Sequence, residues 1–433
     1  MKILKLSLVV FLLISISSVN AQKLSRIEKK ILKQVANNND EALTLLEKVV
    51  NINSGTMNVL GVEKVGAVFS KEFKKIGFTP TWIPMPSEMK RAGHLFCELN
   101  TGNIQGKKLL LIGHLDTVFE ENSPFQTATK EGNKLYGPGV GDIKGGNIII
   151  LYALKSLYET GVLKNTQIIT AFTGDEEKVG FPLSISRKDL IDASKRSDIA
   201  LGFEGATGLN YATVARRSSG SWLLKTKGVR AHSSGIFTKK VGAGAIFEMS
   251  RILNAFYNEL PEQNLTFNPA TIVGGTIVNY DSAQSKGTMF GKTNIVAQEA
   301  IVKGDLRCLT NEQIEKTIAK MKAIISTNLP KTSATISFEL KYPPMKPTPG
   351  NYAVLSVLDA ISIAMGKGNV KAYDPSKRGA GDISFVANYV DCLDGLGTMG
   401  KGSHTPNEYI DLKHFKELTQ RAALLIYRLI NQK

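Results

Sequence analysis

Apolar strands and helices alternate along most of this sequence, and this alternation restricts the folds open to it. The runs 108–113 and 167–173 are almost continuously apolar, which is typical of strands that helices cover on both faces. Further strands are predicted at 78–84, 93–99 and 199–203, and amphipathic helices at 63–76 and 144–159. The alternation predicts an α/β fold with a mainly parallel, doubly wound sheet.

The pattern changes between positions 217 and 342. Strands are predicted there at 220–228, 271–280, 294–309 and 332–340, with helices at 243–260 and 311–328. This is the β-α-β-β-α-β order of a ferredoxin-like α+β domain. Prolines then mark a return linker, before helices at 351–366 and 411–431. We therefore expect one α/β domain, formed by 22–216 and 343–433, that a smaller α+β domain at 217–342 interrupts.

The amino-terminal segment has the pattern of an export signal. Lys2 and Lys5 precede a short apolar run at 6–16, and small residues follow up to Ala21. The run is shorter than the roughly 20 apolar residues that a membrane span needs. We expect residues 1–21 to be a cleaved signal peptide, the protein to be periplasmic or secreted, and no membrane span to remain after cleavage.

Charge and cysteine content exclude several classes of function. The chain of 433 residues has 54 Lys and Arg against 38 Asp and Glu, a net charge of +16. No basic stripe with interleaved aromatic residues accompanies this excess, so nucleic acid is not an expected partner. The three cysteines, Cys97, Cys308 and Cys392, have neither the number of a disulfide framework nor the spacing of a zinc finger. We interpret them as small buried apolar residues.

Polar residues follow the predicted strands directly. His114 and Asp116 come after the strand at 108–113, Glu176 and Glu177 after the strand at 167–173, and Glu204 after the strand at 199–203. Each of these, taken alone, is more often part of a solvated loop. Their common position at strand ends indicates a functional site, because ligands of parallel sheets bind beyond the carboxyl ends of the strands.

Asp142 and His404 extend this set. Asp142 lies in a glycine-rich turn just before a helix, where an aspartate often serves only as a helix cap. His404 lies in a glycine-containing loop before the last helix. Clustered carboxylates resist joint ionisation unless cations neutralise them. Imidazole together with carboxylates suits Zn²⁺, with Mn²⁺ or Co²⁺ as alternatives.

In order and spacing these motifs resemble the dinuclear zinc exopeptidases, the family of bacterial glutamate carboxypeptidase, aminoacylase and succinyl-diaminopimelate desuccinylase. The resemblance covers essentially the whole mature chain. It implies two zinc ions per subunit, with Asp142 bridging them. It further implies that His114 and Glu204 bind one ion and that Glu177 and His404 bind the other.

The same resemblance implies roles for residues beyond the metal ligands. Glu176 matches the general base, Asp116 the carboxylate that orients a metal-bound histidine, and the bond Asp142–Ile143 a cis peptide. His232 matches a histidine that stabilises the oxyanion from the partner subunit, which implies a homodimer through the inserted dimerisation or lid domain. Substrate-binding positions of the family correspond to Arg307, Asn294, Gly379 and Gly381.

Arg378 departs from the family pattern, because a glycine is more usual at that position. The preferred side chain of the substrate is therefore open. The resemblance implies a carboxypeptidase that releases a C-terminal amino acid from a small peptide or an N-acyl amino acid. An N-acyl amino acid deacylase and a dipeptidase of the same family are the alternatives, and a non-catalytic binding relative is a third.

Overall fold

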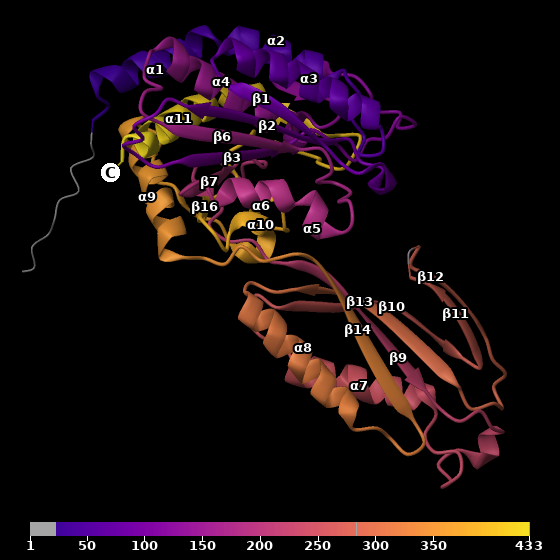
Figure 1. Cartoon of the computed structure of the whole chain (residues 1–433). Helices are drawn as coiled ribbons and strands as arrows, with labels where there is room; N and C mark the ends of the chain where they lie inside the picture. Colours follow the sequence, from indigo (N-terminus) through magenta and orange to yellow (C-terminus); the bar gives the residue numbers. More distant parts are fainter. Residues whose placement is uncertain (1–22, 283, 433) are drawn as a thin grey trace, which may run out of the picture.

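The computed structural model describes residues 23–282 and 284–432, so the predicted signal peptide at 1–21 lies outside the described residues. A larger α/β part and a smaller part, attached at one end, make up the molecule (Figure 1). We call the smaller part, residues 219–342, the insert. Within the described ranges no helix is both long enough and apolar enough to cross a membrane.

A six-stranded sheet forms the centre of the larger part. Strands β6, β3, β7 and β16 are parallel, whereas β2 is antiparallel to both of its neighbours, β1 and β6. The predicted doubly wound sheet is thus confirmed, with an antiparallel edge. In spatial order the strands are β1 (Thr79–Pro84), β2 (Gly93–Asn100), β6 (Gln167–Thr173), β3 (Leu109–His114), β7 (Ile199–Gly202) and β16 (Asp391–Leu393).

Helices cover both faces of this sheet (Figure 1). In β3, Leu109 and Leu111 join the larger apolar core, while Leu110 and Ile112 join the smaller core on the opposite face. This double burial explains the continuous apolar run in the sequence. The helices are α1 (Arg26–Asn37), α2 (Asn39–Val50), α3 (Val59–Lys75), α4 (Gly145–Glu159) and α11 (Leu412–Ile430) on one face. On the other face or at the β16 edge lie α5 (Leu183–Ser186), α6 (Lys188–Ser194), α10 (Ile383–Val386) and α9 (Pro349–Ala364).

Short strands and turns complete this part. The short elements close to the predicted metal ligands Asp142 and His404 are β4 (Thr129–Glu131), β5 (Lys134–Tyr136), β17 (Gly400–Lys401), β18 (Tyr409–Asp411) and the π-helical turn η2 (Val140–Lys144). Elsewhere they are β8 (Tyr211–Ala212), β15 (Lys371–Ala372), and the 3₁₀ turns η1 (Ser87–Met89) and η4 (Pro375–Lys377). All three cysteines are free and buried, as the sequence predicts.

The insert is an antiparallel sheet with two helices on one face (Figure 1). Its spatial order β10-β13-β9-β14 is that of a ferredoxin-like fold, and it has an apolar core of its own around Trp222 and Phe256. Its main elements are β9 (Ser219–Lys227), α7 (Ala245–Glu259), β10 (Thr266–Gly275), β13 (Glu299–Arg307), α8 (Asn311–Ser326) and β14 (Ser333–Tyr342). The 3₁₀ turn η3 (Ser233–Gly235) follows β9.

One prediction for the insert is wrong. The single strand predicted at 271–280 is divided, because β10 ends at Gly275 and β11 (Ile277–Asp281) pairs with β12 (Lys286–Phe290) as a separate hairpin. Gly274 and Gly275 stand at the break, where two residues without side chains weaken a strand. The next strand, β13, also begins at Glu299 instead of position 294.

The chain enters and leaves the insert at one place. Arg216, just before β9, and Met345, just after β14, exchange two backbone hydrogen bonds of 2.9 and 3.0 Å. Both residues are buried. The two connections are therefore fixed to each other at the border of the α/β part.

Candidate dinuclear metal centre

The strand ends meet as the sequence predicts. His114 is the last residue of β3, Glu177 follows β6, and Glu204 follows β7. Because these three strands are parallel neighbours, their carboxyl ends lie at one edge of the sheet. Asp142 comes to the same edge from η2, and His404 from the loop between β17 and β18.

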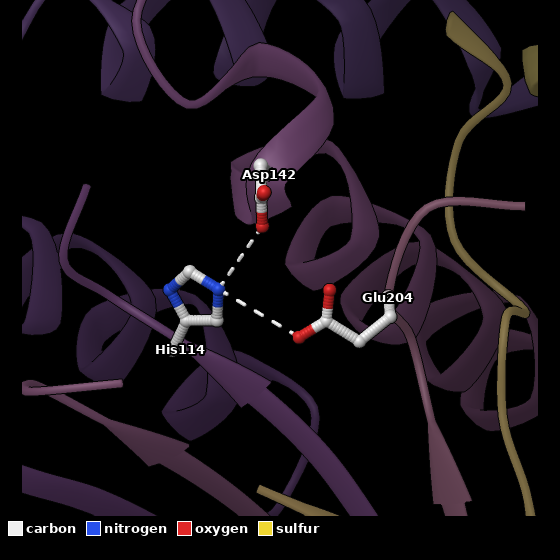
Figure 2. Close-up of side chains that lie close together, drawn as sticks. All are labelled: His114, Asp142 and Glu204. Atoms are coloured by element: carbon white, nitrogen blue, oxygen red, sulfur yellow. Dashed lines mark ion pairs between the residues drawn. The ribbon is translucent and has the colours of Figure 1, made fainter. Parts of the chain in front are cut away.

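One group of donors forms around His114. Its Nε2 lies 3.3 Å from Oδ1 of Asp142 and 3.8 Å from Oε1 of Glu204 (Figure 2). The imidazole is almost completely buried, whereas the two carboxylates are partly open. The nitrogen and the two oxygens therefore converge on a common point.

A second group shares Asp142 with the first. Nε2 of His404 lies 3.2 Å from Oδ2 of Asp142 and 3.2 Å from Oε2 of Glu177. Each oxygen of Asp142 thus faces a different histidine. His404 is 57% exposed and its backbone has a φ of +64°, so this group lies on the solvent side of the centre.

The two groups fit divalent cations. Within each group the donor atoms lie within 4.8 Å of one another. Nε2 of His114 and Oε1 of Glu177 are buried and have no hydrogen-bond partner in the described ranges. Buried polar atoms are nearly always satisfied, so two buried atoms without a hydrogen-bond partner in one centre are consistent with metal ligation. One imidazole and two carboxylates per group suit Zn²⁺.

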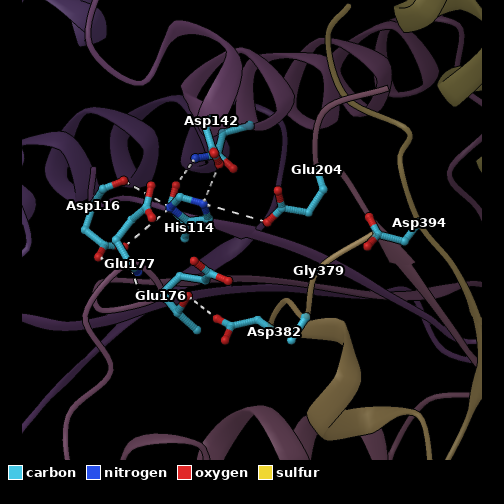
Figure 3. Close-up of polar contacts among 12 residues, drawn as sticks. His114, Asp116, Asp142, Glu176, Glu177, Glu204, Gly379, Asp382 and Asp394 are labelled. Atoms are coloured by element: carbon cyan, nitrogen blue, oxygen red, sulfur yellow. Dashed lines mark hydrogen bonds and ion pairs between the residues drawn. The ribbon is translucent and has the colours of Figure 1, made fainter. Parts of the chain in front are cut away.

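Asp116 holds this arrangement without joining it (Figure 3). Its Oδ1 accepts a hydrogen bond from the amide of Glu176 at 3.0 Å, and its Oδ2 accepts from the amide of Glu177 and the hydroxyl of Thr56. Nδ1 of His114 lies 3.0 Å from the carbonyl oxygen of Asp116, which can only accept. Nδ1 therefore carries a proton, which leaves Nε2 as the nitrogen that can bind a metal.

The charges of the metal-free centre perturb one another strongly. Burial raises the pKa of Glu204 to about 7, and the charge of Asp142 adds to this effect. Hydrogen bonds to Asp142 and Glu177 raise the pKa of His404 to about 11. Burial opposes the charged form of His114, but Asp116 and Asp142 outweigh it, so the pKa of His114 is also raised. In the absence of metals, the protonated imidazole of His404 pairs with the carboxylates of Asp142 and Glu177.

Glu176 lies beside the two groups and is free to act. Its amide is fixed by Asp116, and its carbonyl oxygen accepts a hydrogen bond of 2.8 Å from the hydroxyl of Tyr342. Across 23–282 and 284–432, no residue hydrogen-bonds its carboxylate. Burial raises its pKa well above the ordinary value, and the charge of Glu204 contributes to this rise. A carboxylate of this kind takes up a proton readily.

The sequence does not point to the role of Glu408. This buried carboxylate accepts backbone hydrogen bonds from Gly139, Gly141 and Asp142, at 3.2, 2.7 and 2.9 Å. It thereby fixes the turn that presents Asp142, in which the bond Asp142–Ile143 is cis, as the resemblance implies. Glu408 is four residues from His404, but nothing in its spacing indicates that it binds the backbone of a distant turn.

We expect Glu408→Gln to weaken metal binding about tenfold to a hundredfold, because groups that orient a ligand contribute on this scale. The amide nitrogen of glutamine would face a backbone N–H donor instead of accepting from it. Metal dissociation constants from competition with a chromogenic chelator provide the measurement. Glu131→Gln, an exposed change in β4, is the control. Equal affinities for both variants would contradict the role of Glu408.

The sequence also does not point to a buried ion triad behind Glu176. Arg187, which has no exposed surface, donates to Oδ1 of Asp175 at 2.5 Å and to Oδ1 of Asp382 at 2.8 Å. Asp175 is adjacent to Glu176, and Asp382 ends the glycine-rich loop 379–382. The triad therefore ties the end of β6 to a loop more than 200 residues later in the chain.

The residues predicted to bind the substrate lie at two separate places in the structure. His232 and Asn294 lie together in the insert, where the amide of Ser233 donates to the carbonyl oxygen of Asn294 at 2.9 Å. His232 is exposed, and its ring contacts Ser234. No contact joins it to the predicted metal ligands in the described chain. Arg307 pairs with Asp305 at 2.9 Å, while its Nη1 lies 4.0 Å from the position that a Cβ on Gly379 would take.

Comparison with known proteins agrees with this geometry. The sequence profile of the peptidase family M20/M25/M40 matches residues 110–428, about three quarters of the chain. The chain belongs to this family. It is therefore a metal-dependent hydrolase, and the metal centre of this family is dinuclear. The matched range includes all five predicted metal ligands, from His114 to His404.

Similar proteins act on several substrates. Carboxypeptidase G2 of a Pseudomonas species is 28% identical over 409 residues, which cover 92% of this chain and 91% of the relative. Succinyl-diaminopimelate desuccinylase of Gluconobacter oxydans is 24% identical over 366 residues, covering 79% and 84%.

Solved structures share the fold. An aminopeptidase of Bacillus cereus has a TM-score of 0.74 at 18% identity and covers 90% of this chain and 99% of its own. A dinuclear metal-binding peptidase of Bacillus subtilis from the same family has a TM-score of 0.64 at 13% identity, covering 92% and 100%.

Proposed function

We propose that this protein is an exported, zinc-dependent exopeptidase that releases a C-terminal amino acid from a small peptide or an N-acyl amino acid. The observation that carries the proposal is the pair of donor groups sharing Asp142, with the unengaged carboxylate of Glu176 beside them. The match to carboxypeptidase G2 over nine tenths of both chains favours a carboxypeptidase. A deacylase or dipeptidase of the same family is the alternative.

The two donor groups support the proposed metal ligands. His114 and Glu204 would hold one zinc ion, Glu177 and His404 the other, and Asp142 both. When bound, the two ions supply Lewis-acid activation of the scissile carbonyl and of a water molecule. Co²⁺ and Mn²⁺ suit the same donors.

Glu176 performs the proton transfers in this proposal. Its carboxylate takes a proton from the attacking water and delivers it to the leaving amine. Asp116 and Tyr342 fix the backbone of Glu176, so its carboxylate is held at the metal centre. Burial, the main cause of the raised pKa of Glu176 in the metal-free protein, also favours the neutral carboxyl that the second transfer needs.

Residues of the insert and of the glycine-rich loop 379–382 are proposed to contact the substrate. His232 is proposed to donate to the oxyanion from a partner subunit, because it does not reach the centre of its own chain. Arg307 would bind the free carboxylate of the substrate, since a guanidinium forms two parallel hydrogen bonds with it. Asn294, Gly379 and Gly381 would line the same site. The protein would then act as a homodimer through the insert.

Mixed subunits test this arrangement. His232→Ala and Glu176→Gln homodimers should each be nearly inactive. After exchange of equal amounts, half of the dimers are mixed, and each has one complete site, so about a quarter of wild-type activity should return. If each histidine serves its own chain, mixing restores nothing. Size-exclusion chromatography with light scattering reports the dimer itself.

Metal binding should release protons, because ligands must lose their protons to bind. In the metal-free protein the pKa of His404 is raised to about 11, so its imidazole is protonated at neutral pH, and the pKa of His114 is raised as well. We expect at least one proton to be released per chain at pH 8, and the metal affinity to fall as the pH is lowered. Calorimetric zinc titrations in buffers of different ionisation enthalpy count these protons. A result near zero would contradict the assigned ligands.

A substrate panel tests the activity. The zinc-loaded protein is incubated with benzoyl- and acetyl-amino acids, dipeptides and tripeptides, and the released C-terminal amino acid is measured. Release of the C-terminal residue from both peptides and acyl amino acids supports the carboxypeptidase. Cleavage restricted to acyl amino acids favours the deacylase, and cleavage restricted to dipeptides favours the dipeptidase. No cleavage with any metal would refute the proposal.

We further propose that residues 1–21 direct export to the periplasm or medium and are then removed. On this proposal the mature chain has one catalytic domain, formed by 22–216 and 343–433, and an inserted domain at 217–342. Amino-terminal sequencing of the exported protein should start at Gln22. Retention of the full-length chain in the cytoplasm would contradict the export proposal.

A further inference from the structure

A cavity of about 290 Å³ opens directly beside the metal centre. Gly141, Gly205 and Ser403 contribute to its wall, and each is the chain neighbour of a proposed ligand: Asp142, Glu204 and His404. A group that enters this cavity therefore belongs to a molecule that also reaches the metals. The volume suits one side group of a substrate, not a folded partner.

The lining of this cavity is polar and positively charged. Arg378 and Lys401 are its two ionisable cations, and no Asp or Glu is among its eleven lining residues. Hydroxyl groups supply most of the remaining polar surface, from Thr207, Tyr373, Thr398, Ser403 and Tyr409. Cations surrounded by hydroxyl donors form a site for an anion.

Two polar atoms of this lining are buried without a partner. Nε of Arg378 and Oγ1 of Thr398 have no hydrogen bond to any residue of the described chain, and Thr398 is only 2% exposed. The guanidinium of Arg378 also forms no ion pair within 23–282 and 284–432. Arg378 is half-buried, but its buried Nε is a donor left unsatisfied, which is costly, so the guanidinium indicates a missing anionic partner.

Among the described residues, the carboxylates nearest to Arg378 already face other groups. The nearby carboxylates of Glu204 and Asp142 face the proposed metal positions. The third, Asp394, pairs with Arg216 and accepts a hydrogen bond from the amide of Gly395. The position of Arg378 is nevertheless well defined, because Arg216 donates to the carbonyl oxygens of Gly379 and Ala380, which follow it directly.

We propose that this cavity binds a carboxylate of the substrate, with Arg378 as its main partner and Lys401 at the rim. The inference rests on the proposed function and narrows it to acidic substrates. Two sources share this chemistry. The carboxylate belongs either to the acyl side of the scissile bond, as in a succinyl group, or to the side chain of the released amino acid, as in glutamate.

Binding of four small acids to the zinc-loaded enzyme tests the proposal by isothermal titration calorimetry. Succinate is compared with butanoate, and L-glutamate with L-glutamine, because each pair differs by one carboxylate. We expect at least one carboxylate-rich member to bind more than tenfold more tightly than its match. Arg378→Ala should reduce that advantage about tenfold to a hundredfold, the effect of one charged hydrogen-bonded pair. Which pair responds identifies the source.

Lys377→Ala is the matched control, because it removes a neighbouring exposed charge that does not line the cavity. It should keep the wild-type advantage. Arg378→Lys retains the charge and should fall between the wild type and Arg378→Ala. Thermal unfolding and zinc content show whether each variant is folded and loaded. An advantage that survives Arg378→Ala, or the absence of any advantage in both pairs, overturns the proposal.

The same preparations are assayed with the substrate panel, which separates the two proposals. Hydrolysis without an Arg378-dependent preference would leave the exopeptidase standing and refute the acidic cavity. A preference lost in Arg378→Ala, together with no hydrolysis of any substrate, would refute the exopeptidase and leave an acid-binding site. A preference for carboxylate-bearing molecules that depends on Arg378, in both binding and kcat/KM, supports both the exopeptidase and the acid-binding cavity.

Discussion

Replacing Glu176 with glutamine is expected to lower kcat by about 10²–10⁴-fold, the usual contribution of general acid–base catalysis. Glutamine keeps the size and polarity of the side chain but can neither accept the proton of the water nor return it to the leaving amine. The backbone contacts of Glu176 with Asp116 and Tyr342 are unaffected by the change. Metal content should therefore stay near two ions per chain.

Glu177→Gln is the matched control for this experiment. It makes the same chemical change one residue later, but it weakens a proposed metal ligand. We expect it to lose one ion in dilute chelator and to regain activity with added zinc, whereas Glu176→Gln regains none. Steady-state kinetics and elemental analysis of both proteins provide the data. Near-wild-type kcat for Glu176→Gln would rule out the proposed mechanism.

Replacing Arg187 with methionine is expected to lower the free energy of unfolding by about 3–5 kcal/mol, because it leaves two buried carboxylates without their cation. Asp175 has no exposed surface, and Asp382 is 3% exposed. The fall in Tm should be about 5–10 °C by differential scanning calorimetry. Activity should also fall at temperatures below the transition, since Asp175 is adjacent to Glu176.

Arg196→Met is the control for charge loss alone. Arg196 pairs with Glu98 at 2.6 Å, but both side chains are more than one third exposed. Solvent and salt screen such a pair, so its loss should change stability by less than about 1 kcal/mol. If both arginine variants unfold at the same temperature, the buried triad does not stabilise the fold.

The convergence of the proposed metal ligands could be predicted because their position in the sequence reflects their position in the sheet. His114, Glu177 and Glu204 each follow an apolar run, and the carboxyl ends of parallel strands meet. Glu408 and Arg187 could not be predicted in this way. Both act on the backbone or side chains of segments far away in the sequence, and neither interaction leaves a periodic pattern.

The order of strands and helices could be predicted because the burial of each element fixes the spacing of its apolar residues. The hairpin β11–β12 could not be predicted because the strand-favouring pairs Ile272–Val273 and Ile277–Val278 continue the pattern on both sides of Gly274 and Gly275. Such residues indicate a strand but do not show which partner strand it takes. The position of Arg378 beside the candidate metal centre also depends on tertiary structure, because Arg216 hydrogen-bonds the residues that follow it.

The paired bonds between Arg216 and Met345 have a consequence for folding. Loop-closure entropy depends on the distance between the ends of a segment and rises slowly with its length. Because its ends are held together, the insert of more than 120 residues costs the α/β part about as little loop-closure entropy as a short turn would. Each part can then form its own core. The insert could accordingly lengthen, shorten or be replaced during evolution at little entropic cost to the sheet that carries the candidate metal centre.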